Sequence, residues 1–384
     1  MTEPEELVQR ARDLVPKLRE RAAETERQRR PLAENVEALK VAELTKVAQP
    51  ARFGGLGLDF SVAFDISAEL GRGCGSTAWC HAIWSSHNWI LGMFPEQAQE
   101  EYWADSPDTL SSTSLNPAGA QVTQLEEGYQ LSGQWDFSSG CDASSWVLLV
   151  GIGPCGPLMF LLPRSDYAIE DTWFVSGLRG TGSKDIRVEN VFVPNHRTLS
   201  MQDMREARTP GRIIHDTPNY RIPLRSILSF ILAAPVVGMA QGTIEAFESY
   251  LRGRISMSSG DRMAEFAGIQ MRLAESEAEV RAARLLMRHD AQEMFARARQ
   301  NEMPNLEERA RYRRDQAYVA RLCLQAVNRL FEAGGGHALY DSSALQRFHR
   351  DTHAACHHVS LYWDSVAVQY GQVRLGQEPS SPDL

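Results

Sequence analysis

Apolar residues recur at every third or fourth position over residues 3–30, where Leu7, Ala11, Leu14, Leu18 and Ala22 share one face. Such spacing is typical of an amphipathic helix. A proline at position 31 suits the first turn of a second helix, which we expect to run to about residue 41. After a Gly-rich turn, the same periodicity predicts helices over residues 61–72, 76–93 and 95–104. The first third of the chain is therefore predicted to be helical.

The pattern changes between residues 109 and 205. Short runs rich in β-forming residues are separated by Gly, Pro, Ser and Asp, at 129–137, 146–150, 158–162 and 186–193. This spacing predicts a compact antiparallel β-barrel or sandwich. A Pro-rich connector follows at 209–223, and helical patterns return at about 225–254, 264–300, 306–335 and 343–370.

Helices, strands and long helices thus occupy separate blocks, which predicts an α+β protein with a helical bundle and not a doubly wound parallel sheet. We expect an N-terminal helical domain at 1–108, a central β-domain at 109–208 and a C-terminal helical domain at 209–384.

Composition limits the kinds of partner. The chain has 384 residues and a formal net charge of −9, which argues against nucleic acid or an anionic membrane as the main partner. No segment reaches about 18 uninterrupted apolar residues, and the N-terminus is acidic where a signal peptide is basic. Six cysteines without a C-x-x-C pair indicate unpaired thiols. We expect a cytoplasmic protein.

Two motifs invite a functional interpretation that their context does not support. Gly151-Ile-Gly-Pro-Cys-Gly156 matches the dinucleotide fingerprint, but a strand follows it where a helix N-terminus is required, so we expect a hairpin turn. His349, His353 and His357 are four residues apart on one predicted helix, a spacing that zinc sites use. No second segment supplies a carboxylate, so we expect a polar helix face and no metal site.

Two further segments are open to two interpretations each. Trp135-Asp-Phe-Ser-Ser-Gly-Cys141 is either an ordinary strand exit or a polar site beside a strand end. Gly177-Leu-Arg-Gly-Thr-Gly-Ser183 is either a flexible loop or a set of amides, hydroxyls and one guanidinium for an anion or a flavin edge.

Taken with four other segments, these motifs resemble the two-component, reduced-flavin-dependent aromatic monooxygenases of the acyl-CoA dehydrogenase fold. The other segments are Cys74-Gly-Ser-Thr-Ala-Trp79, His87-Asn-Trp89, Phe192-Val-Pro-Asn-His-Arg197 and Leu345-Gln-Arg-Phe-His-Arg-Asp-Thr-His353. Where acyl-CoA dehydrogenases often carry a catalytic Glu, this chain has His357 and His358. The matches run in the family's order from about residue 30 to 360, and oxygenase components acting on secosteroid phenols and 4-hydroxyphenylacetate are the most similar types.

The resemblance implies roles for individual residues. His87 lies where the family has a substrate-pocket histidine, and His358 matches a histidine beside the flavin C4a position and the substrate hydroxyl. Ser138 and Ser139 lie where a serine meets the flavin N5 edge, and Ser139 is counted with the two histidines as catalytic. The other residues expected to bind the cofactor are Ser112, Ser114, Trp135, Arg179, Thr181, Ser183 and Arg254, the last reaching the flavin of a neighbouring subunit.

The implied function is hydroxylation of an aromatic substrate, phenolic, polycyclic or of the indole type, through a C4a-hydroperoxyflavin. The cofactor would be FMNH2 or FADH2 from a separate NAD(P)H:flavin reductase, the co-substrate O2 and the assembly a homotetramer. An imidazole of near-neutral pKa would accept or share the phenol proton. The alternative is an acyl-CoA dehydrogenase or oxidase. A catalytically silent helical scaffold is the interpretation from a different class.

Overall fold

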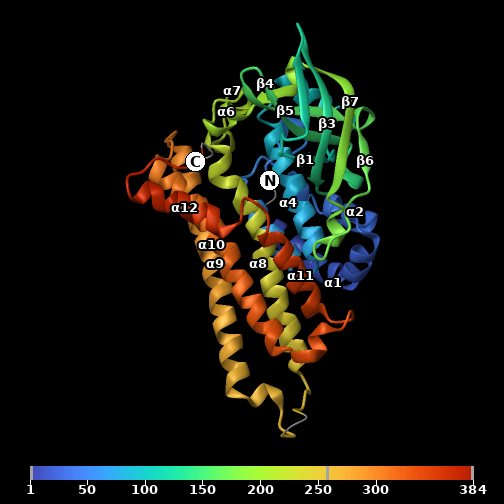
Figure 1. Ribbon diagram of the computed structural model, residues 1–384, viewed down its shortest axis with the longest axis vertical. Coiled ribbons are helices and arrows are strands. Elements are labelled where there is room, and N and C mark those ends of the chain that lie inside the picture. Colours follow the sequence, from blue (N-terminus) through green and yellow to red (C-terminus); the bar gives the residue numbers. More distant parts are fainter. Residues whose placement is uncertain (1–2, 257–258, 382–384) are drawn as a thin grey trace.

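The computed structural model describes residues 3–256 and 259–381 (Figure 1). The predicted N-terminal helices are confirmed within a few residues. Of the predicted apolar stripe, Leu7, Ala11, Leu18 and Ala22 are buried, whereas Leu14 is only partly covered. The helices are α1 (Pro4–Gln28), α2 (Ala33–Val41), α3 (Val62–Gly71), α4 (Gly75–Leu91) and α5 (Glu96–Trp103).

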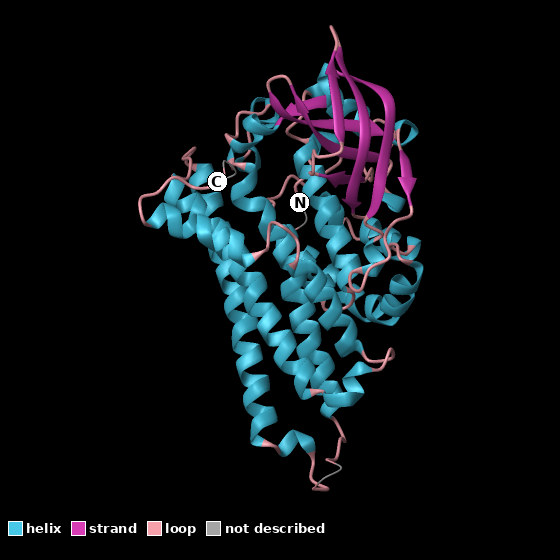
Figure 2. Cartoon of the chain, viewed as in Figure 1, coloured by secondary structure: helices cyan, strands magenta, loops and turns pink. Residues whose placement is uncertain are grey.

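The central segment forms two four-stranded sheets, in the orders β1-β4-β5-β8 and β2-β3-β7-β6, which pack around an apolar core (Figure 2). The sandwich prediction is confirmed, with one correction: β1 pairs with β4 in parallel, so the arrangement is mixed and not wholly antiparallel. The strands are β1 (Ser111–Ser114), β2 (Ala120–Gln124), β3 (Gly128–Ser138), β4 (Trp146–Gly153), β5 (Gly156–Pro163), β6 (Ala168–Glu170), β7 (Lys184–Pro194) and β8 (Thr198–Ser200).

The apparent dinucleotide motif lies on a hairpin, as predicted. Strands β4 and β5 pair in antiparallel register up to Gly153 and Gly156, and the two residues between them form the turn. All six cysteines are unpaired, and Cys155 at this turn is exposed.

The C-terminal helices form a bundle with α8 at its centre (Figure 1). The predicted connector at 209–223 contains short helices, and the predicted single helix at 343–370 is wrong, because the chain leaves helical geometry after Cys356 and re-enters it at Trp363. The helices are α6 (Met201–Arg205), α7 (Pro210–His215), α8 (Leu224–Leu251), α9 (Ala267–Arg299), α10 (Leu306–Ala333), α11 (Ala344–Cys356) and α12 (Trp363–Arg374).

Helix α8 is long and apolar enough to cross a membrane by length and composition, but 94% of its most apolar window is buried inside the protein. Burial by neighbouring helices is what a core helix shows. The structure confirms the α+β prediction, whereas the domain limits at 108 and 208 stay a prediction.

Candidate active site

Helix α4 joins the helical region to the β-sheets and carries two of the residues of interest. Trp79 Nε1 donates to Ser139 Oγ at 3.2 Å, and Trp84 Nε1 donates to Ser144 Oγ at 3.3 Å. The helix begins at Gly75, where a Cβ atom would lie 2.4 Å from Met239 Sδ. A larger residue there would displace the Met239 side chain of α8, so the glycine lets α4 and α8 pack closely.

A β-bulge in β3 sets the direction of the serines at its end. Trp135 pairs with Ile186 and Ser138 with Lys184, so β3 has one extra residue, and Phe137 has a φ of +63°. In a regular strand Ser138 would face away from Trp135, since successive side chains alternate. The bulge turns Ser138 inward, and both Ser138 and Ser139 are buried.

The predicted flavin-binding hydroxyls lie together. Ser138 Oγ donates to Ser112 Oγ at 2.9 Å, and Ser139 Oγ is 2.7 Å from Ser183 Oγ, which is 2.6 Å from Thr181 Oγ1. The buried Ser114 is two residues from Ser112 on β1 and so faces the same side of that strand. These hydroxyls come from β1, β3 and the loop before β7, and that they bind a flavin stays a prediction.

Two other predicted cofactor residues differ in their surroundings. Trp135 lies in the apolar core of the β-sandwich and donates its indole N–H to Val150 O at 2.8 Å. Arg179 is partly buried, and its Nε atom has no hydrogen-bond partner within residues 3–256 and 259–381. A role in flavin binding stays a prediction for both residues. Of the two, only Arg179 has an N–H donor that no described residue uses.

His87 is buried near the β1 end of α4 as a neutral imidazole. Its Nδ1 donates to the carbonyl oxygen of Ser111 at 2.6 Å, and burial lowers its pKa to about 4. A neutral ring that donates from Nδ1 keeps its lone pair on Nε2. His87 therefore offers a hydrogen-bond acceptor at Nε2.

His358 lies in the turn between α11 and α12, and not on a continuous helix as predicted. The backbone N–H of Ser360 donates to His358 Nδ1 at 3.1 Å, so the neutral ring carries its proton on Nε2. The ring packs edge-on against Trp79, with centroids 5.8 Å apart. His358 therefore offers a hydrogen-bond donor at Nε2, the reverse of His87.

The sequence suggested a near-neutral pKa for His358, and this expectation is wrong. Desolvation, together with the positive charges of Arg313 and Arg225, lowers the pKa to about 4, although the residue is partly exposed. Gaining a proton on Nδ1 would also break the hydrogen bond from Ser360. His358 is thus held neutral, which suits it to donate a hydrogen bond and not to take up a phenol proton.

Arg254 is not beside the serine cluster of its own chain. It follows α8, in the loop at the end of the bundle farthest from the sheets (Figure 1). Its Nη2 donates to Tyr250 Oη at 2.7 Å, and its guanidinium lies 4.6 Å from the centre of the Tyr250 ring.

His349 and His353 of α11, with His357 directly after the helix, form a polar face, as predicted. His349 stacks on Phe331 with ring centroids 4.1 Å apart, and His353 Nε2 lies 2.7 Å from Asn328 Oδ1. His357 Nδ1 bonds to the carbonyl oxygen of His353 at 2.7 Å.

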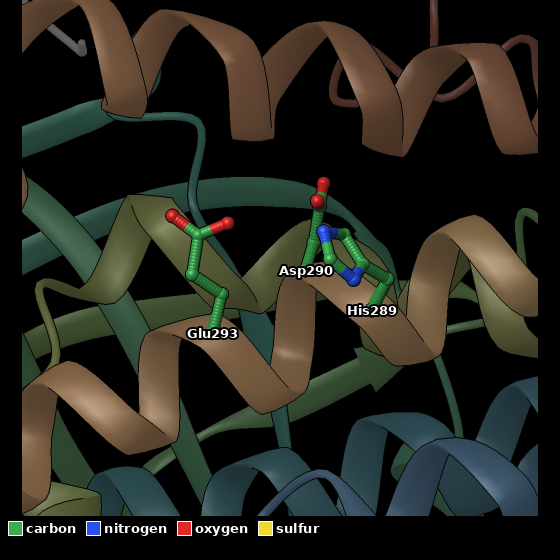
Figure 3. Close-up of side chains that lie close together, drawn as sticks. All are labelled: His289, Asp290 and Glu293. Atoms are coloured by element: carbon green, nitrogen blue, oxygen red, sulfur yellow. The ribbon is translucent and has the colours of Figure 1, made fainter.

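Figure 3 shows a different group of metal-binding residue types, His289, Asp290 and Glu293 of α9, whose ligand atoms lie within 4.8 Å of one another. Arg311 already occupies this group, since it bonds to Asp290 at 3.3 Å and to both Glu293 oxygens at 2.8 Å. An ion-pair network between α9 and α10 accounts for these contacts.

Two residues with a part in the site were not assigned a role from the sequence. Trp79 closes one quoted motif and contacts both Ser139 and His358. Asp351 lies in another and accepts the backbone N–H of Leu178 at 2.7 Å. Both residues belong to motifs that carry the family resemblance, but the motifs do not indicate which residues Trp79 and Asp351 contact.

The fold and the site have counterparts in known proteins. Family models match two parts of the chain: the acyl-CoA dehydrogenase N-terminal domain at residues 1–106 and the acyl-CoA dehydrogenase C-terminal domain at residues 230–363. The chain is 37% identical to the FADH(2)-dependent resorcinol hydroxylase oxygenase component of Rhizobium sp., over 97% of this chain and 95% of that protein.

It is also 37% identical to the flavin-dependent monooxygenase oxygenase subunit HsaA of Mycobacterium tuberculosis, over 96% of this chain and 94% of that protein. The crystal structure of 3-HSA hydroxylase from Rhodococcus sp. RHA1 matches with a TM-score of 0.94 at 34% identity, covering 99% of both chains. The chain therefore belongs to the family of flavin-dependent monooxygenase oxygenase components that share the acyl-CoA dehydrogenase fold.

Proposed function

We propose that the chain hydroxylates a phenolic or similarly electron-rich aromatic substrate, with reduced flavin against the serine cluster and the substrate beside α4. The observation that carries the proposal is the pair of neutral histidines of opposite tautomer: within the described residues, His87 has an acceptor and His358 a donor at an Nε2 atom without a partner. A phenol has one oxygen that donates through its proton and accepts through its lone pairs, so these two groups suit it.

The residues of the cluster fit a reduced flavin. Reduced flavin has an N–H at N5, which requires an acceptor, and the oxygens of Ser138 and Ser139 lie in a dry, buried cluster. The unpaired Nε of Arg179 suits an electronegative oxygen at the flavin edge. Reduced flavin supplies the electrons that activate O2 in this family.

The positive charges near His358 favour the reactive form of the substrate. Arg313 and Arg225 disfavour a proton on His358 and would, by the same attraction, stabilise a phenolate oxygen nearby. A phenolate ring is more electron-rich and therefore more readily attacked by an electrophilic oxygen. The alternative of an acyl-CoA dehydrogenase is not favoured, because the turn after α11 presents His358 where a carboxylate base is needed and the relatives are monooxygenases.

As an oxygenase component, the chain works with a partner reductase and an aromatic substrate. That the reductase uses NAD(P)H, that the protein is cytoplasmic and that it forms a homotetramer are part of the proposal.

Turnover is expected to require reduced flavin, O2 and a phenol together. With a separate flavin reductase and NADH, a phenol such as resorcinol should be hydroxylated, whereas the chain with NADH alone should give no product. The dimethyl ether of resorcinol has no hydroxyl proton for His87 and cannot ionise, so it should react at least about 10²-fold more slowly. Product analysis with and without reductase measures this, and equal turnover of phenol and ether would contradict the substrate assignment.

Replacing Arg254 by lysine is expected to weaken reduced-flavin binding about tenfold while the oligomer persists. Because Arg254 lies far from the serine cluster of its own chain, we propose that it reaches the flavin of a neighbouring subunit, where its rigid fork would meet polar oxygens. The neighbouring exposed Arg252, changed to lysine, is the matched control. Anaerobic titration of wild type and both variants measures the change, and a monomeric preparation that binds reduced flavin as tightly as the assembled protein would refute the shared site.

A further inference from the structure

A chain of hydrogen bonds runs from the helix α4 into the loop that precedes β7. Trp79 Nε1 donates to Ser139 Oγ at 3.2 Å, and Ser139 Oγ lies 2.7 Å from Ser183 Oγ. Ser183 Oγ lies 2.6 Å from Thr181 Oγ1, which bonds to the carbonyl oxygen of Leu178 at 2.8 Å. All four side chains are buried, so water does not compete for these groups.

The two end groups of this hydrogen-bond chain, the Trp79 indole and the Leu178 carbonyl, decide which atom donates in each hydrogen bond. The carbonyl of Leu178 can only accept, so Thr181 uses its single hydroxyl proton there. Ser183 must then donate to Thr181, and Ser139 must donate to Ser183. The indole N–H of Trp79 can only donate, which is consistent with an oxygen of Ser139 that accepts. Ser139 is left with one free lone pair and no free proton.

Helix α11 holds the loop segment in which the hydrogen-bond chain ends. The Leu178 N–H donates to the buried Asp351 Oδ1 at 2.7 Å, and Arg350 Nη1 donates to the carbonyl oxygen of Ser176 at 2.6 Å. A Cβ atom on Gly177 would lie 2.0 Å from the carbonyl oxygen of Arg350, so only glycine allows the loop to approach α11 so closely. The Arg350-Asp351 motif thus holds the Gly177–Leu178 peptide, which directly precedes the Leu178 carbonyl that ends the hydrogen-bond chain.

We propose that Thr181, Ser183 and Asp351 are positioning residues that fix Ser139 as a hydrogen-bond acceptor and so make the site select reduced over oxidised flavin. The inference rests on the proposed placement of flavin N5 at Ser139. Reduced flavin has an N–H at N5 and gains a hydrogen bond from the free lone pair. Oxidised flavin has a lone pair at N5, which faces the lone pair of Ser139 and finds no proton there.

Breaking the chain at Thr181 is expected to reduce this selectivity. In Thr181→Val the shape is kept, but Ser183 loses its acceptor and can turn its proton elsewhere, which frees Ser139 to donate to oxidised N5. The ratio of the dissociation constants for oxidised and reduced flavin, from aerobic and anaerobic titrations, should fall about tenfold, as expected for one hydrogen bond. Ser183→Ala should lower the ratio similarly, and Thr181→Ser, which keeps the hydroxyl, should restore it.

Thr352→Val is the matched control, because Thr352 is equally buried, adjoins Asp351 and has a hydroxyl with no partner within the described residues. The ratio of its dissociation constants for oxidised and reduced flavin should equal that of the wild type. A fall in this ratio as large as that of Thr181→Val would overturn the inference. Ser139→Ala separates the two proposals. If it leaves both dissociation constants unchanged, flavin N5 is not at Ser139; if it weakens reduced-flavin binding while Thr181→Val and Ser183→Ala keep the wild-type ratio, the directed chain is wrong.

Discussion

Replacing His358 with alanine is expected to slow hydroxylation by about 10²–10³-fold, the size of effect seen when one hydrogen-bond donor that stabilises a negatively charged oxygen is removed. His358 presents an N–H at Nε2 beside Trp79, with the charges of Arg313 and Arg225 nearby. Losing it removes the donor that would stabilise a substrate oxygen. Rapid mixing of the reduced-flavin complex with O2 and substrate, followed by product analysis, measures the change.

The adjacent His357 is the control for that experiment, because it is exposed and its ring bonds to the carbonyl oxygen of His353, one turn back in α11. His357→Ala should hydroxylate normally, and His358→Gln, which supplies an N–H of similar reach, should recover part of the rate. Since the pKa of His358 is lowered to about 4, its ionisation should not affect the rate between pH 6 and 8, and loss should begin only below about pH 5. A His358→Ala variant with normal rate and normal product yield per O2 would show that the residue only shapes the turn.

The break before His358 explains why sequence reasoning mistook this region for one helix. No glycine or proline occurs between Ala344 and Gly371, so no local signal ends a helix there. The helix ends because His358 accepts the Ser360 N–H and Arg313 of α10 bonds to the Ser360 carbonyl at 3.4 Å. The side chain proposed for function is also one that forms the turn.

In the β-region, too, some features have a local sequence signal and others depend on contacts between distant residues. The long strands carry enough β-forming residues to be predicted, whereas β1, Ser-Ser-Thr-Ser, resembles a loop in sequence. The serine motif was found by resemblance, but the bulge at Phe137 and the chain from Trp79 to Leu178 join residues that are distant in the sequence. Such contacts depend on how α4, β3 and the loop before β7 pack against one another, and sequence periodicity does not predict that packing.

The protein is expected to lose stability steeply as the pH falls from about 6.5 to 4.5. Burial lowers the pKa of four histidines to about 4, and these are His81, His87, His215 and His358. Unfolding restores an ordinary pKa near 6.5, so within this window the unfolded chain binds more protons than the folded one. The free energy of unfolding therefore falls as protons are added.

Two buried carboxyl groups act in the opposite direction. Burial raises the pKa of Asp351 to about 6, and burial together with Asp315 raises that of Asp290. Near pH 5 each holds a proton in the folded chain that it releases on unfolding. Four imidazoles gaining a proton and two carboxyl groups losing one leave a net uptake of about two, hence a slope of about 3 kcal/mol per pH unit.

Replacing His81 tests the origin of this slope. His81 is fully buried, with Ser67 Oγ 2.8 Å from Nδ1 and the carbonyl oxygen of Leu44 2.9 Å from Nε2. Burial lowers its pKa and holds it neutral, although the hydrogen bond to Leu44 acts in the opposite direction. His81→Gln keeps a donor and an acceptor but cannot take up a proton, so its curve should be shallower by about 1.4 kcal/mol per pH unit even though the variant is less stable at pH 7. Denaturant unfolding at several pH values gives both slopes, and parallel curves for the variant and the wild type would show that buried imidazoles are not the cause.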